Sequence, residues 1–106
     1  MQAHTIWIEA EVWDPESWDP TDANSDVIVR CGDGTSWVAT FFTYSNIATL
    51  TEKNRRTGEN LHGRYFWASD MILVDEISRQ RIQEVVAYLI ECDEFTTLFM
   101  KQGEWE

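Results

Sequence analysis

Cysteine, proline and histidine are scarce in this sequence, which contains two residues of each. Cys31 and Cys92 are far apart and neither belongs to a paired motif, so no disulfide framework or zinc motif is evident. They are most simply two reduced thiols of a cytoplasmic protein, with a single Cys31–Cys92 disulfide as the alternative. His4 and His62 have no second ligand at metal-binding spacing, so we expect neither a metal nor another cofactor.

Long apolar runs are also missing, and no stretch approaches the roughly 20 residues that span a membrane. The N-terminus lacks the basic start of a secretory signal, and Glu9 and Glu11 interrupt the first apolar run. We therefore expect a cytoplasmic protein without membrane contact. With 106 residues and 43% hydrophobic content, residues 1–106 can form a single domain with its own core.

Basic residues are few, since eight Lys and Arg stand against 19 Asp and Glu and give a formal net charge of −11. Residues 1–29 contain seven acids and no Lys or Arg, whereas half of the basic residues lie between Lys53 and Arg64. Clustered carboxylates repel phosphate and attract basic surfaces, so we expect no nucleic-acid partner. The charge indicates either simple solubility or a basic protein partner.

Tryptophan is abundant, with six residues in the chain. A Trp-Asp-Pro unit occurs twice, at Trp13-Asp14-Pro15 and Trp18-Asp19-Pro20, at the start of a predicted loop over 14–25. Proline keeps the preceding residue extended, so each unit is a stiff support for an indole beside a carboxylate. Two interpretations are open: these tryptophans anchor a partner as interface hot spots do, or they fold back as a lid over the sheet.

Hydrophobic periodicity predicts an α+β fold. The predicted strands cover 4–14, 26–31 and 35–44, followed by a helix over 45–56, strand structure within 65–75, a helix capped by Asp75 or Ser78, and a short helix over 94–101. Residues 65–75 are compatible with one bulged strand or two short strands. The order β-β-β-α-β-α favours an antiparallel or mixed sheet of 4–5 strands with helices mainly on one face.

Apolar residues are predicted on both faces of the sheet. Between the sheet and the long helix we expect a core of Ile6, Ile8, Val29, Val38, Ile72, Val85, Val86 and Leu89. Because two short helices cannot cover both faces, we expect the loop over 14–25 to cover part of the second face. A second subunit, giving a homodimer, or another partner would cover the rest. The candidate partner-binding residues are Trp7, Trp13, Asp14, Trp18, Asp19 and Trp37.

Motifs that would carry chemistry are weak. Residues 22–26 resemble the opening of a calcium loop, but the required Gly and Glu are replaced by Val27 and Asp33. Asp70 lies in an apolar stretch, where a carboxylate must find hydrogen-bond partners. It is either a turn residue or a candidate buried polar anchor for Arg64 or the basic cluster from Lys53. No catalytic motif is evident, so we predict no catalytic residues.

These observations favour a non-enzymatic binding module, most concretely an acidic inhibitor that docks on a basic partner. In its small size, acidity and tryptophan content the chain is similar to bacterial immunity proteins, which block a partner toxin. This similarity is compositional and assigns no role to any residue. The alternatives are a homo-oligomeric structural domain, whose aromatic sheet face is its own interface, and a small enzyme or ligand-binding domain using Asp70 and His62 in an aromatic pocket.

Overall fold

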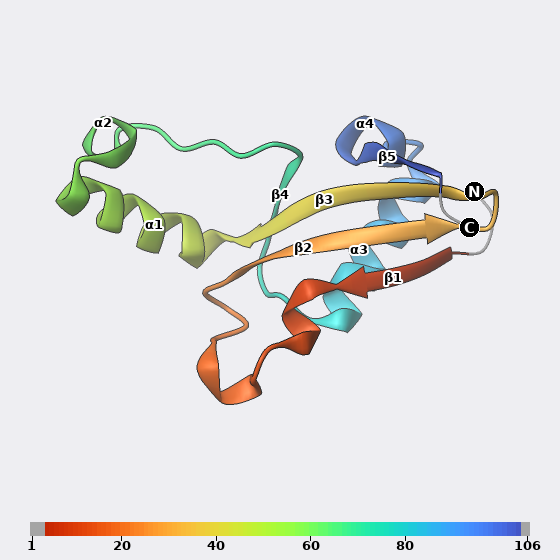
Figure 1. The fold of residues 1–106 in the computed structure, drawn as a ribbon, viewed down its shortest axis with the longest axis horizontal. Coiled ribbons are helices and arrows are strands. Elements are labelled where there is room, and N and C mark those ends of the chain that lie inside the picture. The colour runs from red at the N-terminus through yellow and green to blue at the C-terminus, as the bar shows by residue number, and fades with distance from the viewer. Residues whose placement is uncertain (1–3, 105–106) are drawn as a thin grey trace.

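Five strands form one mixed sheet in the computed structural model, which describes residues 4–104 (Figure 1). The strands are β1 (His4–Ile8), β2 (Asn24–Cys31), β3 (Thr35–Thr43), β4 (Met71–Val74) and β5 (Met100–Glu104). The spatial order is β1-β2-β3-β4, and β5 also pairs with β3. One edge of β3 is thus shared: β4 runs parallel to Thr40–Thr43, and β5 runs antiparallel to Thr35–Val38.

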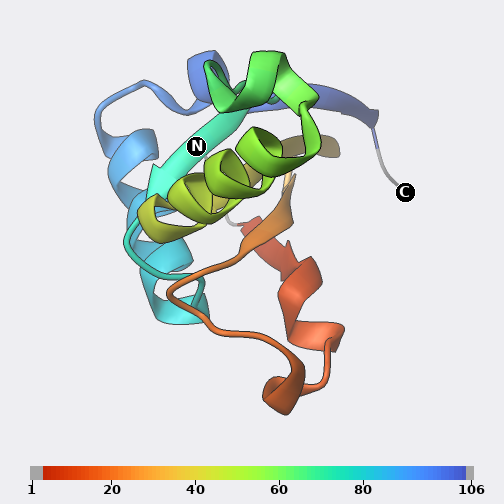
Figure 2. The same ribbon diagram turned by 90° about the vertical axis from the view of Figure 1, so that its left-hand side faces the viewer.

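The helices divide into two groups. α3 (Arg79–Glu91) and α4 (Phe95–Leu98) lie behind the sheet in Figure 1, on one of its faces. α1 (Tyr44–Thr57) continues away from the end of β3 and leads into the short α2 (Glu59–Gly63). Figure 2 has this α1–α2 arm nearest the viewer. The predicted α+β fold, with four or five strands and the packed helices on one face, is therefore confirmed.

The first strand is shorter than predicted. β1 ends at Ile8 and is followed by a 3-10 turn, η1 (Glu9–Val12). The buried Ala10 N–H donates to the Ser25 hydroxyl over 3.0 Å, which takes the backbone out of the sheet ladder. Val12, which the alternating pattern places on the aliphatic side of the strand, is 71% exposed. The predicted strand over 4–14 is therefore wrong beyond Ile8.

Turns and caps join the central elements as the sequence indicates. The hairpin between β2 and β3 closes with a hydrogen bond from Gly34 N–H to the Cys31 carbonyl oxygen (3.0 Å), and Gly34 has a φ of 89°. The N-cap of α1 is Thr43, two residues before the predicted start of the helix at 45, because the Thr43 hydroxyl accepts from Asn46 N–H. Gly58, at φ 89°, ends α1 as predicted.

A left-handed helical turn follows Gly58, in a stretch for which the sequence predicts neither helix nor strand. Asn60, Leu61 and His62 have φ values of 53°, 52° and 58°. Gly63 completes the turn at φ 77°, where an added Cβ would lie 2.6 Å from the Thr51 carbonyl oxygen. Only glycine allows this close approach of α2 to α1.

The C-terminal half differs from the prediction in its last strand. Residues 65–70 are irregular and only Met71–Val74 form a strand, so 65–75 contains one short strand. Of the two predicted caps of α3, Asp75 and Ser78, the structure has Ser78, which accepts from Arg81 N–H over 3.2 Å. The helix expected over 94–101 is helical only in α4, and Met100 begins β5.

The core lies between the sheet and α3–α4. Seven of the eight predicted core residues belong to it or pack against it, and Val38 does not. On β3, Ala39 and Phe41 are the residues that face the core, so Val38 lies on the opposite face, where it pairs with Ile28. α4 and the residue after it also contribute to the core, where Phe95 and Phe99 stack with ring centroids 4.5 Å apart.

Candidate functional site

The two Trp-Asp-Pro units close one end of the core. Trp13 and Trp18 are half-buried against it and meet edge to face, with ring centroids 5.3 Å apart. The Pro20 carbonyl oxygen accepts from Ile77 N–H over 2.8 Å, which attaches the loop to the segment before α3. The expectation that this loop covers the second face is therefore wrong, because the loop packs against the core side.

The aspartates of these units are exposed and held by local turns. Asp14 Oδ1 accepts from Glu16 N–H over 3.1 Å. Asp19 Oδ1 accepts from the backbone N–H and the hydroxyl of Thr21, over 2.9 and 2.8 Å, and these bonds lower the pKa of Asp19. Both carboxylates therefore have fixed positions while facing water.

An acidic end results, defined here as Asp14, Glu16, Asp19 and Glu76. The Pro20–Ile77 hydrogen bond brings Glu76 to the side of the loop. Within residues 4–104, none of these four carboxylates forms an ion pair. The nearby Arg81 already forms ion pairs with Asp75 and Glu84.

The fourth acid of the loop over 14–25, Asp22, has a structural role. Asp22 accepts from Asn46 Nδ2 over 2.9 Å and from the Thr49 hydroxyl over 2.8 Å, both in the first turns of α1. Asn46 in turn accepts from Asn24 Nδ2 over 2.9 Å. A carboxylate near a helix N-terminus is also favoured by the helix dipole. Asp22 thereby fixes the root of the α1–α2 arm.

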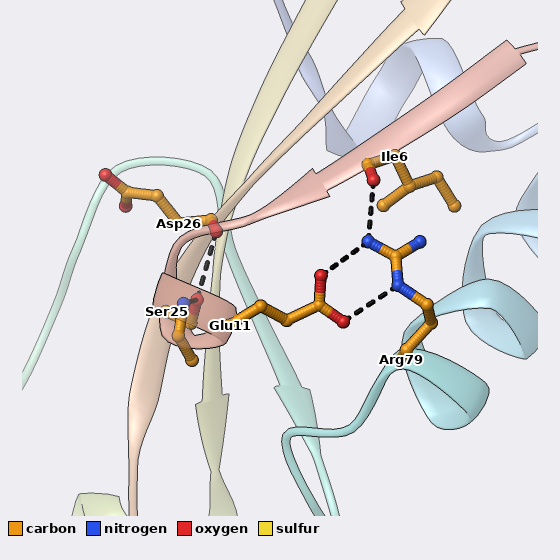
Figure 3. A network of polar contacts seen from close by, with 6 residues as sticks. Ile6, Glu11, Ser25, Asp26 and Arg79 are labelled. Carbon is orange, nitrogen blue, oxygen red and sulfur yellow. Dashed lines mark hydrogen bonds and ion pairs between the residues drawn. The ribbon is translucent and has the colours of Figure 1, made fainter. Parts of the chain in front are cut away.

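The outer edge of β1 is occupied by a fork of hydrogen bonds (Figure 3). The Arg79 guanidinium donates to both Glu11 carboxylate oxygens, over 2.8 and 2.7 Å, and to the Ile6 carbonyl oxygen over 2.9 Å. The side-chain hydrogen bond from Arg79 lowers the pKa of Glu11. Because a backbone acceptor of this edge strand is taken, pairing of another strand with β1 is disfavoured.

The second face of the sheet carries an exposed apolar row. Strand register places Trp7 beside Ile28, Ile28 beside Val38, and Val38 beside Met100. Trp7 is 41% exposed and Met100 49%, and no helix crosses in front of β1–β3 in Figure 1. We call Trp7, Ile28, Val38 and Met100 the apolar row, and the face that carries it the open face.

Polar residues border the apolar row on either side along β2. Asp26 and Arg30 lie two residues before and after Ile28, so both share its face. Asp26 accepts from the Thr40 hydroxyl over 2.9 Å, and its N–H donates to Glu9 Oε1 over 3.3 Å. Arg30 is exposed and forms no ion pair with any residue that the structure describes. The face is acidic on one side of the row and basic on the other.

Trp37 lies on the core side of β3 and not with Trp7. It is half-buried, packs edge to face on Phe95 with ring centroids 5.7 Å apart, and donates from Nε1 to the Thr35 hydroxyl over 2.9 Å. On the open face, Phe42 is covered by Phe66, whose ring centroid lies 5.4 Å away. The candidate residues thus lie in three places. The loop at one end of the core carries Trp13, Asp14, Trp18 and Asp19, the core side of β3 carries Trp37, and the open face carries Trp7.

Asp70 and His62 are not brought together. Asp70 is a half-buried turn residue at φ 51° before β4, and the described residues provide it with no ion pair to Arg64 or the basic cluster. His62 is exposed in α2, at the far end of the arm. Four open clefts of about 190–550 Å³ lie along α3, β1 and α4, and neither residue lines them.

Residues 4–104 contain neither a metal-binding cluster nor a membrane-spanning helix. No group of three or more His, Cys, Asp or Glu in this range could hold a metal ion. No helix there has the length and apolar character to cross a membrane. Cys31 is buried and Cys92 is exposed, and no disulfide joins the two.

The sequence-based prediction lacks two parts of the open face, namely the residues of β2 and Met100 of β5. Ile28, Asp26 and Arg30 could have been found, because alternation along β2 places all three opposite the buried Val27 and Val29. Met100 could not, because its position depends on the unpredicted pairing of β5 with β3.

Comparison with known proteins adds no functional information. No protein-family model matches the chain, and neither a curated protein nor a solved structure gives a significant match.

Proposed function

We propose that this protein is a non-enzymatic, cytoplasmic binding module that docks through its acidic end on a basic protein partner. The observation that carries the proposal is the acidic end itself, where four carboxylates form no ion pair with any residue that the structure describes. The formal net charge of −11 gives the whole molecule a field of the same sign.

The proposal is also supported by how the acidic end is held. Asp14 and Asp19 are fixed by turns of their own, and the indoles beside them are packed together on the core. Pre-organised charges lose little conformational entropy on binding. Such a surface accelerates encounter with a basic partner and disfavours acidic ones. Inhibition of that partner, as by an immunity protein, is the most concrete form of this function.

The experiment compares two triple variants of equal charge. Asp14→Asn, Glu16→Gln and Asp19→Asn together remove the three exposed charges of the loop while keeping the side-chain acceptors of its turns. The control, Glu91→Gln, Asp93→Asn and Glu94→Gln, removes the same charge from exposed residues at the end of α3 and in the turn that leads to α4. Each immobilised protein captures partners from cells of the source organism, and the captured proteins are quantified by mass spectrometry.

We expect a basic protein to be retained by the wild type and the control and lost from the loop variant. Its binding should weaken with salt, because the contact is electrostatic. Equal capture by both variants, or capture of acidic proteins alone, would contradict the proposal. The product of a neighbouring gene is the first protein to test for direct binding and inhibition.

A further inference from the structure

The open face lies outside the acidic end, and its pattern of charge suits one kind of occupant. We propose that the open face is a homodimer interface in which the apolar row packs on the same row of a second copy. The two-fold axis runs along the row, across the strands. This interface is independent of the acidic end and of the partner that binds there.

The strand register determines which residues of the two copies face each other in such a dimer. A two-fold axis along the row leaves positions along the row unchanged and reverses positions along the strands. Ile28 therefore lies over Ile28 of the second copy, and Val38 over Val38. Asp26, two residues to one side of the axis, lies over Arg30 of the second copy. By symmetry, Arg30 lies over Asp26 of the second copy, so the dimer contains this charge pair twice.

Charge complementarity favours a second copy of this chain over a different protein as the occupant of the open face. A chain with 19 acids and eight bases repels itself at most surfaces. On the open face, however, Arg30, which forms no ion pair within residues 4–104, and the exposed Asp26 lie two residues from Ile28 on opposite sides of the row. Self-association therefore joins opposite charges twice while it covers Trp7 and Met100, which are 41% and 49% exposed.

The edges of the sheet are consistent with packing face to face. Arg79 and Glu11 occupy the outer edge of β1, which disfavours a continuous sheet formed through that strand. Two sheets that pack through their faces lie about 10 Å apart, which long side chains such as Arg30 can cross. The acidic ends of the two copies then point in opposite directions along the strands and stay free.

The test is sedimentation equilibrium over a concentration series at about 0.15 M salt, where long-range repulsion is screened. We expect the mass of the wild type to rise from 12.4 kDa towards twice that value. Asp26→Arg alone and Arg30→Asp alone each place like charges together twice, and each should weaken the dimer at least tenfold. The double variant should return to within threefold of the wild type.

Matched controls separate this pairing from net charge. Glu16→Arg changes the net charge as Asp26→Arg does, and Arg56→Asp changes it as Arg30→Asp does, at exposed positions away from the open face. Neither control should weaken the dimer tenfold. An equimolar mixture of the Asp26→Arg and Arg30→Asp proteins should dimerise at least tenfold more tightly than either alone, because every introduced charge then meets its opposite.

Three results would overturn the inference. These are a wild type that stays monomeric at all concentrations, single variants that behave like their controls, and a mixture no tighter than its components. A monomeric wild type would leave the open face to a different protein. The triple variant Asp14→Asn, Glu16→Gln and Asp19→Asn should dimerise like the wild type. Sedimentation therefore tests the dimer and partner capture tests the docking function, so failure of one is distinguishable from failure of the other.

Discussion

The carboxylate of Asp22 and the amide of Asn46 are joined by a hydrogen bond of 2.9 Å, although 24 residues separate them in the chain. This bond connects the loop that carries the acidic end to the root of the α1–α2 arm. Asp22 is the one carboxylate of the loop that binds α1, whereas Asp14, Glu16 and Asp19 face water. Neighbouring acids of one loop thus differ in role because of what lies beside them.

Replacing Asp22 by Ala should cost about 1–2 kcal/mol of unfolding free energy, because two donors of α1 lose a charged acceptor. Asp22→Asn retains one acceptor oxygen and should cost less. Amide hydrogen exchange at 44–50 should accelerate in Asp22→Ala before exchange in β2 does. Glu16→Ala is the control, and it should stay within about 0.5 kcal/mol of the wild type. Equal losses in the two Ala variants would contradict this role for Asp22.

The assignment of sheet faces can be checked with two truncations. Leu89→Ala removes a buried side chain of α3 and should cost roughly 2–5 kcal/mol in denaturant unfolding. Val38→Ala removes a side chain of the open face and should cost less than half as much in the monomer. The reverse order of the two values would mean that β3 presents its other face to the core.

The left-handed turn of α2 predicts a stabilising glycine. Leu61 is 64% exposed and has a φ of 52°, a conformation that costs a residue with a Cβ about 1–2 kcal/mol. We therefore expect Leu61→Gly to stabilise the protein by up to about 1 kcal/mol. In the right-handed helix α1, the exposed Ala48→Gly should destabilise it by about 1 kcal/mol. Thermal unfolding of the two variants should show shifts of opposite sign, and a lower melting temperature for Leu61→Gly would contradict the conformation of the turn.

The ion pair between Glu11 and Arg79 predicts a pH dependence of stability. The pKa of Glu11 lies below its ordinary value in the folded protein, chiefly because of the hydrogen bond from Arg79. The pair therefore stabilises the fold above the unfolded-state pKa, and this contribution is lost as the pH falls through the lower folded-state pKa. At pH 7, Glu11→Gln should be less stable than the wild type by about 0.5–1 kcal/mol, a value already reduced for solvent screening.

Urea unfolding of Glu11→Gln and wild type between pH 7 and acid should show this difference shrinking as Glu11 is protonated. Glu16→Gln removes the same charge from an exposed residue with no described ion pair, so its difference from wild type should be smaller at pH 7. A Glu11→Gln difference that is constant with pH would show that the pair contributes nothing through its charge.

Local signals predicted much of this fold. Ser78 and Gly58 mark the helix ends that the sequence indicates, and the apolar spacing of Ile82, Val86 and Leu89 identifies the buried face of α3. The errors occur where distant residues decide the conformation. β1 ends where Ala10 meets the Ser25 hydroxyl, 15 residues away.

The last strand and the open face could not be predicted by the same means. Residues 100–104, Met-Lys-Gln-Gly-Glu, have little β propensity and no alternating pattern, and they form a strand because one half of the β3 edge is left free by β4. Val38 was misplaced because β3 has apolar residues on both faces, so period alone does not distinguish its two sides.

The contact between Trp13 and Trp18 has an optical consequence. Two indoles that meet edge to face at 5.3 Å couple their electronic transitions, so the pair has a circular dichroism signal that isolated tryptophans lack. This signal reports on the acidic loop without any label. Because each ring packs separately against the core, a loop that opens would lose the coupled bands while the helices keep theirs. Release of the loop and unfolding of the domain would thus be distinguishable in one spectrum.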